Sequence, residues 1–204
     1  MKKRIVFATT NEGKMDEIRN ILSDCAYEIL SMKEAGICTD ADENGNSFEE
    51  NARIKAACAA KFLPEDIVMA DDSGLEIDYL NKEPGIYSAR YLGEDTPYET
   101  KNKVLIQRLT GVEKERRTAR FVSAIAAAVP GEGIFTVRGT VEGYIGWEPA
   151  GTNGFGYDPI FYVDEYDCST AELTMEQKNA FSHRGNALRA MKKMLVDKGI
   201  LRNC

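Results

Sequence analysis

Residues 68–77 read VMADDSGLEI, and this stretch decides how the rest of the chain is interpreted. An apolar run stops at two neighbouring aspartates, and Ser73 and Gly74 follow before the sequence turns mostly apolar again. Adjacent carboxylates repel each other unless a cation lies close to them. The stretch therefore has two interpretations: a buried strand that ends in an Asx turn capped by Gly74, or a strand that ends at a site for Mg²⁺.

Strand-like and helix-like segments alternate on both sides of this stretch, which indicates an α/β fold with a mixed sheet flanked by helices. Two longer apolar runs are joined by Pro-Gly-Glu-Gly, a sequence that favours a hairpin. We expect one domain over residues 1–204. The predicted strands are residues 5–8, 27–30, 67–70, 121–129 and 134–145. One predicted helix starts near residue 14, two more cover 48–62 and 100–109, and residues 174–193 are predicted to form a final helix or helix pair.

The helix predicted at residues 48–62 follows an acidic, turn-rich loop at 39–46. Ser47 precedes Glu50 by three residues, which is the spacing of a capping box. The loop offers Glu43 as a further carboxylate for a metal ion. Because Mg²⁺ usually takes one or two carboxylates together with substrate phosphates, this loop and the aspartates form one candidate site.

Composition limits the classes of function. The chain has a net charge of −7, which disfavours a nucleic-acid partner. Its five cysteines form no CxxC pair and it has one histidine, so a Cys/His zinc site is not expected. The apolar run at the N-terminus is too short for a signal peptide, and no stretch is long enough to span a bilayer. We expect a cytoplasmic protein with no membrane partner.

Three further motifs carry groups that suit a phosphate or a base. Residues 8–14 (ATTNEGK) link a strand to a helix N-terminus that could bind phosphate, although they also fit a capped helix with a solvated lysine. Residues 151–159 (GTNGFGYDP) could bring backbone and an aromatic ring against a base, or could be a glycine-rich loop with core aromatics. Residues 178–184 (KNAFSHR) supply hydrogen-bond donors for a carbonyl edge, or a basic helix end.

These motifs, taken together and in this order, resemble the inosine triphosphate pyrophosphatase family. The stretches that carry the resemblance are ATTNEGK, SFEENARIKA, ADDSGLEID, PGIYSARY, GTNGFGYDPIF and KNAFSHRGNAL, which lie between residue 8 and about residue 188. The resemblance implies hydrolysis of ITP, dITP and XTP to the monophosphate and pyrophosphate with Mg²⁺ as cofactor. It also implies an elongated mixed sheet with two lobes, an active-site cleft between them, and a homodimer.

The resemblance assigns roles to particular residues. Glu43 and Asp72 are expected to bind the metal, and Asp72, with Asp71 beside it, is expected to be the catalytic base. Thr10 and Glu12 depart from the usual phosphate loop, and the charge of Glu12 makes its backbone the better phosphate contact. The expected substrate-binding residues are Thr9, Thr10, Asn11, Glu12, Gly13, Lys14, Ser73, Phe155, Gly156, Tyr157, Asp158, Lys178, His183 and Arg184.

Base selection is expected to depend on the 6-keto group of hypoxanthine and xanthine, which accepts from Arg184 or His183, whereas adenine presents a donor there. Three alternatives remain: a pyrophosphatase for modified pyrimidine or methylated nucleotides, a nucleotide-binding regulator without hydrolysis, and a nucleic-acid-binding module. The complete set of Glu43, Asp71 and Asp72 disfavours the regulator.

Overall fold

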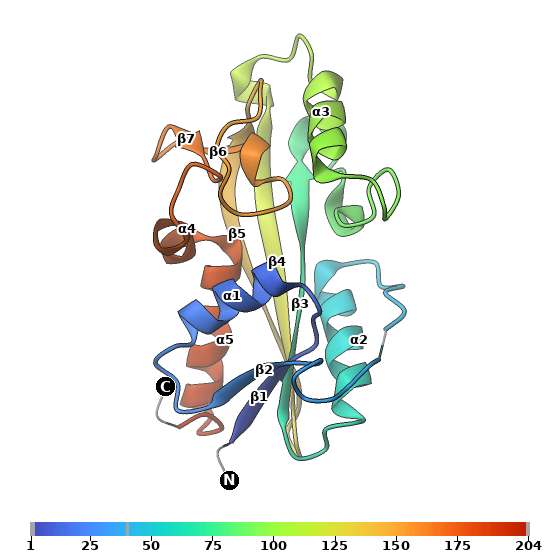
Figure 1. Cartoon of the computed structure of the whole chain (residues 1–204), viewed down its shortest axis with the longest axis vertical. Helices are drawn as coiled ribbons and strands as arrows, with labels where there is room; N and C mark the ends of the chain where they lie inside the picture. The colour runs from blue at the N-terminus through green and yellow to red at the C-terminus, as the bar shows by residue number, and fades with distance from the viewer. Residues whose placement is uncertain (1–2, 40, 203–204) are drawn as a thin grey trace. The chain divides into compact units, whose positions relative to one another are not determined.

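The computed structural model describes residues 3–39 and 41–202, so Asp40 in the predicted acidic loop lies outside the described residues. Its strands form one seven-stranded mixed sheet in the order β2-β1-β3-β4-β5-β6-β7 (Figure 1). Strand β1 pairs in parallel with β2 and β3, whereas β6 pairs antiparallel with β5 and β7. The strands are Arg4–Phe7, Glu28–Ser31, Ile67–Ile77, Thr118–Val129, Gly133–Ile145, Phe161–Val163 and Cys168–Ser169.

Five α-helices accompany the strands within the described residues: α1 Glu12–Ile21, α2 Phe48–Ala60, α3 Tyr98–Arg108, α4 Met175–Phe181 and α5 His183–Asp197. Helix α1 packs against α5. The α/β class and the mixed sheet predicted from the sequence are confirmed. None of these helices is both long and apolar enough to cross a membrane.

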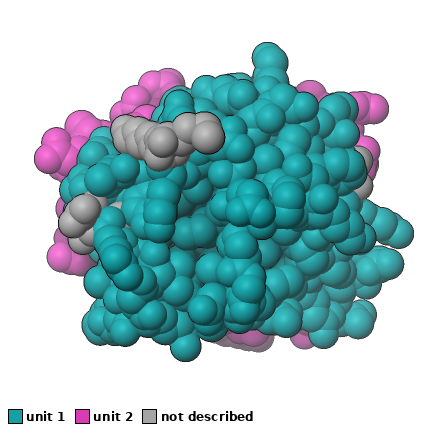
Figure 2. All heavy atoms as spheres, turned by 90° about the horizontal axis from the view of Figure 1, so that it is seen from below, with its two compact units in different colours: residues 1–72, 123–139, 183–204 teal, residues 73–122, 140–182 magenta. Residues whose placement is uncertain are grey.

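The chain divides into two compact units, which Figure 2 shows in different colours. Unit 1 contains residues 1–72, 123–139 and 183–204, and unit 2 contains residues 73–122 and 140–182. Each unit has a hydrophobic core of its own. Unit 1 buries Phe7, Ile18 and Met191 among others, and unit 2 buries Leu75 and Leu105. Strands β3, β4 and β5 each contribute residues to both units.

The prediction that the third strand ends at the aspartates is wrong. Strand β3 continues through Asp71, Asp72, Ser73 and Gly74 as far as Ile77. Gly74 is buried within the strand and forms no turn. Successive side chains of a strand point to opposite faces, so Asp71 and Asp72 lie on different sides of the sheet. This single correction separates the surroundings of the two carboxylates.

Two predicted helix features are resolved by the structure. The final segment, predicted as a helix or a helix pair, is a pair, because Ser182 has an extended backbone (φ −59°, ψ 153°) and separates α4 from α5. The capping box at Ser47 is incomplete: Ser47 accepts from the Glu50 N–H, but the Glu50 carboxylate accepts from the Asn46 N–H. A complete capping box joins Thr174 and Gln177 at the start of α4.

Candidate active site

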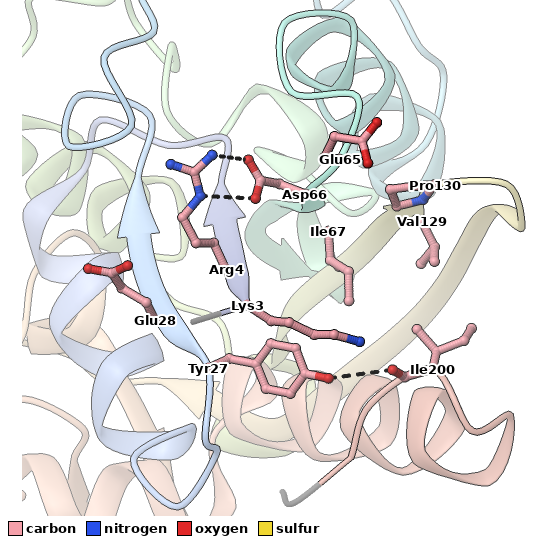
Figure 3. A pocket seen from close by; sticks show the side chains of 10 residues that line it. All are labelled: Lys3, Arg4, Tyr27, Glu28, Glu65, Asp66, Ile67, Val129, Pro130 and Ile200. Atoms are coloured by element: carbon pink, nitrogen blue, oxygen red, sulfur yellow. Dashed lines mark hydrogen bonds and ion pairs between the residues drawn. The ribbon is translucent and has the colours of Figure 1, made fainter. Parts of the chain in front are cut away.

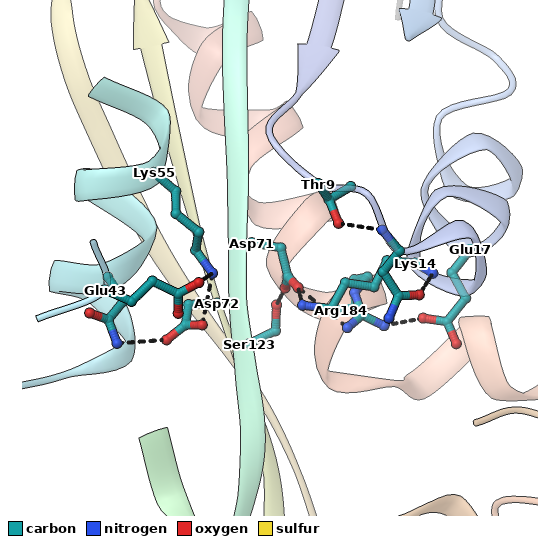
Figure 4. A network of polar contacts seen from close by, with 11 residues as sticks. Thr9, Lys14, Glu17, Glu43, Lys55, Asp71, Asp72, Ser123 and Arg184 are labelled. Atoms are coloured by element: carbon teal, nitrogen blue, oxygen red, sulfur yellow. Dashed lines mark hydrogen bonds and ion pairs between the residues drawn. The ribbon is translucent and has the colours of Figure 1, made fainter. Parts of the chain in front are cut away.

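Asp71 lies on the face of β3 that α1 and α5 cover, and it is almost completely buried (Figure 4). Its carboxylate lies 2.5 Å from the Lys14 ammonium and 3.4 Å from the Arg184 guanidinium, and it accepts from the Ser123 hydroxyl at 2.5 Å. Burial opposes ionisation of Asp71, but Arg184 and Lys14 outweigh burial and hold its pKa well below the ordinary range. Asp71 is therefore a fixed anion.

Arg184 connects this group to a second buried carboxylate, because its guanidinium also forms an ion pair with Glu17 of α1. Burial opposes the charge of Arg184, whereas Asp71 and Glu17 raise its pKa. The formal charges of Lys14, Arg184, Asp71 and Glu17 cancel. This compensation explains how three buried ionisable side chains and the partly buried Lys14 can lie together on one side of the sheet.

Asp72 points to the opposite face of β3, toward α2 and the loop before it (Figure 4). Its carboxylate accepts from the Lys55 ammonium at 2.9 Å and from the Asn51 amide at 3.2 Å. The Glu43 carboxylate lies 3.4 Å from the same Lys55 nitrogen. Glu43 and Asp72 therefore converge on one cation, and the group formed with Lys55 has a formal charge of −1.

The environment of Asp72 differs from that of Asp71 in its effect on acidity. Burial raises the pKa of Asp72 above its ordinary value, although Lys55 acts in the other direction. Burial likewise opposes the charge of Lys55, but Asp72 and Glu43 outweigh it and raise the pKa of Lys55. Asp72 is consequently the better proton acceptor of the two neighbouring aspartates.

The predicted phosphate loop leads from β1 into α1. Asn11 is the N-cap of α1, and its side chain accepts from the Lys14 N–H at 3.0 Å. The Thr9 hydroxyl accepts from the Asn11 N–H at 3.2 Å, and Thr10 and Glu12 are exposed. Gly13 lies in the first turn, where amide groups are open to an anion. Burial lowers the pKa of Lys14 despite the neighbouring Asp71.

The glycine-rich loop at residues 151–158 lies in unit 2 and is organised around buried Asp158. The Asp158 carboxylate accepts from the Phe155 N–H at 2.9 Å, from the Lys178 ammonium at 2.7 Å and from the Thr170 hydroxyl at 2.9 Å. Lys178 also lies 5.1 Å from the centre of the Phe155 ring. The aromatic ring and the lysine are thus held together by one carboxylate.

A glycine is required at position 154 of this loop. Gly154 has a φ of +74°, and a Cβ at this position would collide with the Asp158 carboxylate. Gly156 also has a positive φ, and its carbonyl accepts from the Asn102 amide at 3.2 Å. Tyr157 is buried and donates to the Ser88 carbonyl at 2.7 Å. The buried side chains of Asp158 and Tyr157 therefore hold the loop through their hydrogen bonds.

The structure divides the KNAFSHR motif between two surroundings. Lys178 belongs to α4 and lies with Asp158 and Phe155 in unit 2, whereas His183 and Arg184 begin α5 in unit 1. Both His183 and Arg184 are buried. Ser73 is half-buried on β3, one residue beyond Asp72. The substrate roles assigned to these residues stay predictions.

Sequence reasoning missed four side chains that contact the two aspartates or their partners: Asn51, Lys55, Glu17 and Ser123. Asn51 and Lys55 are four residues apart on α2, and Glu17 is three residues from Lys14 on α1. Helical spacing places Glu17 on the same face as Lys14, which is the signal that could have found it. Asn51 and Lys55 share a face of α2 only with each other, and Ser123 lies on β4, so no spacing relative to a selected residue points to these three.

A cavity of about 680 Å³ lies elsewhere in unit 1, at the amino ends of the parallel strands (Figure 3). Its lining includes Arg4, Glu28 and Ile67, which are the first residues of β1, β2 and β3. Open α/β sheets bind ligands at the carboxyl ends of their strands, where the phosphate loop follows β1. The cavity is thus separate from the candidate site.

The protein is an α/β protein in which β3 carries two neighbouring aspartates. The groups around Asp71 and Asp72 lie on opposite faces of this strand and differ in formal charge. The sequence profile of the Ham1 family matches residues 5–194, and the chain belongs to this family. A dITP/XTP pyrophosphatase of Bacillus subtilis (strain 168) is 48% identical over 193 residues, which cover 95% of this chain and 97% of that protein. A relative of the same description from Thermoanaerobacter pseudethanolicus is 47% identical over 196 residues, covering 95% and 96%.

Solved structures agree with these sequence matches. The Ham1 protein of Staphylococcus aureus is 42% identical, with a TM-score of 0.85 and coverage of 96% of this chain and 100% of that chain. A nucleoside-triphosphatase described as dITP/XTP pyrophosphatase from Mycobacterium abscessus is 40% identical, with a TM-score of 0.73 and coverage of 92% and 98%. The expected family is thus confirmed.

Proposed function

We propose that this protein hydrolyses deaminated purine nucleoside triphosphates, namely ITP, dITP and XTP, to the monophosphate and pyrophosphate. The observation that carries the proposal is that the carboxylates of Asp72 and Glu43 both approach the ammonium group of Lys55 beside β3. Near full-length similarity to proteins named dITP/XTP pyrophosphatase supports the substrate class. The role of the enzyme is then to remove damaged purine nucleotides from the nucleotide pool.

The proposal includes Mg²⁺ as the cofactor, held by Glu43 and Asp72. Both carboxylates already approach the same cation, Lys55, and their group keeps one formal negative charge. Among the described residues no three His, Cys, Asp or Glu side chains form a metal-binding group, so the proposal rests on the Glu43 and Asp72 pair alone. Mg²⁺ commonly accepts one or two carboxylates together with substrate phosphates, and when bound it would neutralise phosphate charge.

In the proposed mechanism, a water oxygen attacks the α-phosphorus and the bond to pyrophosphate breaks. Asp72 takes the proton of this water, for which its raised pKa is suited. The amides of the first turn of α1, together with Lys14, bind phosphate oxygens. Asp71 keeps Lys14 and Arg184 in place as a permanent anion. Phe155 stacks on the base, and Lys178, His183 and Arg184 supply donors to its keto group.

We also propose a cytoplasmic homodimer that needs no nucleic acid or membrane partner, as the family resemblance and the net charge of −7 support.

One assay tests the function: release of pyrophosphate from ITP, dITP, XTP, ATP and GTP, each with and without Mg²⁺. We expect release from the deaminated purines only, and only with the metal. Equal rates on all five, or release of orthophosphate instead, would contradict the proposal. A preference for methylated or modified pyrimidine nucleotides would favour the alternative enzyme class.

A further inference from the structure

Asn102 of α3 is a buried polar residue next to the glycine-rich loop at 151–158. It is 4% exposed, and its amide nitrogen donates to the Gly156 carbonyl at 3.2 Å. Its amide oxygen is buried and has no hydrogen-bond partner within the described part of the chain. A buried acceptor without a partner is unfavourable, so stability alone would favour an apolar side chain here. The hydrogen bond to the Gly156 carbonyl is the interaction that an apolar side chain at this position would lack.

Gly156 directly follows Phe155, and the loop around this ring is held from two elements. Asp158 accepts from the Phe155 N–H at 2.9 Å, and Asn102 holds the carbonyl of the next residue. Gly154 and Gly156 both have positive φ values, 74° and 70°, so Phe155 stands between two glycines. Glycine has the largest backbone freedom, so these tethers limit the orientations that the ring can take.

Helix α3 is held in place by contacts other than the hydrogen bond of Asn102. The Lys101 ammonium donates to the Ala89 carbonyl at 2.5 Å, and Leu105 is completely buried in the core of unit 2. The Tyr98 ring also packs against the Tyr157 ring of the loop at 5.1 Å, edge to face. Removal of the Asn102 amide should therefore loosen the loop at Gly156, next to Phe155, without displacing the helix.

We propose that Asn102 is a positioning residue that sets the orientation of Phe155 and thereby the affinity for the purine base. This inference rests on the proposed function, in which Phe155 stacks on that base. Asn102 and its hydrogen-bond partner Gly156 both belong to unit 2, and this contact lies next to Phe155 in the chain. Its loss should weaken substrate binding and leave the rate of the bound substrate unchanged.

The test compares Asn102→Leu with Gln107→Leu, a matched amide-to-leucine change at an exposed position of the same helix. For Asn102→Leu we expect KM for dITP to rise about tenfold while kcat stays within about twofold. Gln107→Leu should change neither value. In a Phe155→Ala background the Asn102 change should add nothing, because the residue acts through the ring. An unchanged KM, a loss in kcat alone, or the same increase in that background would overturn the inference.

A spectroscopic readout separates this inference from the proposed function. The chain has eight phenylalanines, and the ¹⁹F resonance of fluorophenylalanine that disappears in Phe155→Ala identifies the ring. Asn102→Leu should shift or broaden this resonance, whereas Gln107→Leu should not. A protein that leaves dITP intact but shows the shift would refute the function and keep the positioning role. An unmoved resonance would refute the positioning role, and Asn102→Ala serves both measurements if the leucine variant does not fold.

Discussion

Asp71 and Asp72 are neighbours in the chain, yet they meet opposite electrostatic surroundings because a strand turns successive side chains to different faces. Asp71 is enclosed by two cations, and its pKa lies well below the ordinary range, since these cations outweigh burial. Asp72 shares one lysine with Glu43, and burial raises its pKa. The surroundings of Asp71 keep it ionised, whereas those of Asp72 make it the better proton acceptor.

This contrast predicts two different consequences of the same substitution. Asp72→Asn should lower kcat for dITP about a thousandfold, because the proton acceptor is lost, and should affect turnover more than the binding of dITP. Asp71→Asn should lower the free energy of unfolding by about 3–5 kcal/mol, because Lys14 loses this carboxylate and Arg184 keeps only the ion pair with Glu17 of its two carboxylate partners. Kinetics and urea denaturation on both variants check this. Near-full activity of Asp72→Asn with Mg²⁺ would exclude Asp72 as the base.

Sequence reasoning selected these two aspartates as site residues, which stays a prediction, but it misplaced them within the element. Asp, Ser and Gly favour turns locally, so the pattern predicted a strand end. The groups that make a buried acidic strand acceptable lie far away in the chain: Ser123 is 52 residues from Asp71, and Arg184 is 113 residues away. Such long-range compensation leaves no periodic signal in a single sequence, so the local preference prevailed in the prediction.

At the scale of elements, the loop at 151–158 needs glycine at position 154 because of its positive φ and because of the nearby Asp158 carboxylate. Gly154→Ala would bring both a strained positive φ and a collision with Asp158, which holds Phe155 and Lys178. Gly131→Ala in the turn between β4 and β5 has nearly the same φ, +76°, but open space around it. We expect each variant to lose about 1–3 kcal/mol of stability, and only Gly154→Ala to raise KM for dITP. Equal KM values would contradict the collision argument.

The short helix η1, Asp78–Leu80, is tied to β4 by charge. Asp78 accepts from Thr118 at 2.7 Å and from Arg120 at 3.1 Å, and it pairs with Lys82. Burial opposes ionisation of Asp78, but Lys82, Thr118 and Arg120 outweigh it and lower its pKa to about 2 from an ordinary 3.8. Its stabilising effect is therefore present above pH 3.8 and is lost as the pH falls toward 2.

A variant can test this assignment. Asp78→Asn has no carboxylate to protonate, so its stability should depend less on pH than that of the natural protein in this acidic window. The free energy of unfolding at pH 6 should fall modestly, because the pair is partly exposed and screened. Urea denaturation at several acidic pH values measures both effects. Parallel pH curves for the two proteins would show that Asp78 is not responsible.

At the scale of the whole molecule, the sequence predicted the regular elements better than their long-range contacts. Apolar runs located β1, β2 and the β4–β5 pair because burial alone determines such strands. The two-residue strand β7 escaped prediction, since Cys168 and Ser169 carry no periodicity. The residues of the KNAFSHR motif are adjacent in the chain, but the extended backbone at Ser182 gives Lys178 and Arg184 different partners.

The two units have separate cores but share three strands, which leads to a prediction about cooperativity. Leu195 is completely buried in the core of unit 1, and Leu105 is equally buried in the core of unit 2. Loss of either core would disrupt β3, β4 and β5, whose residues belong to both units. We therefore expect the chain to unfold in a single thermal transition.

Leu195→Ala and Leu105→Ala should each cost about 2–5 kcal/mol, because each leaves a cavity in a packed core. For a chain of this size the single Tm should fall by roughly 10 °C in both variants. Calorimetry of the natural protein should give equal calorimetric and van't Hoff enthalpies. Two transitions, one lowered only by Leu195→Ala and the other only by Leu105→Ala, would show instead that the shared strands do not couple the units.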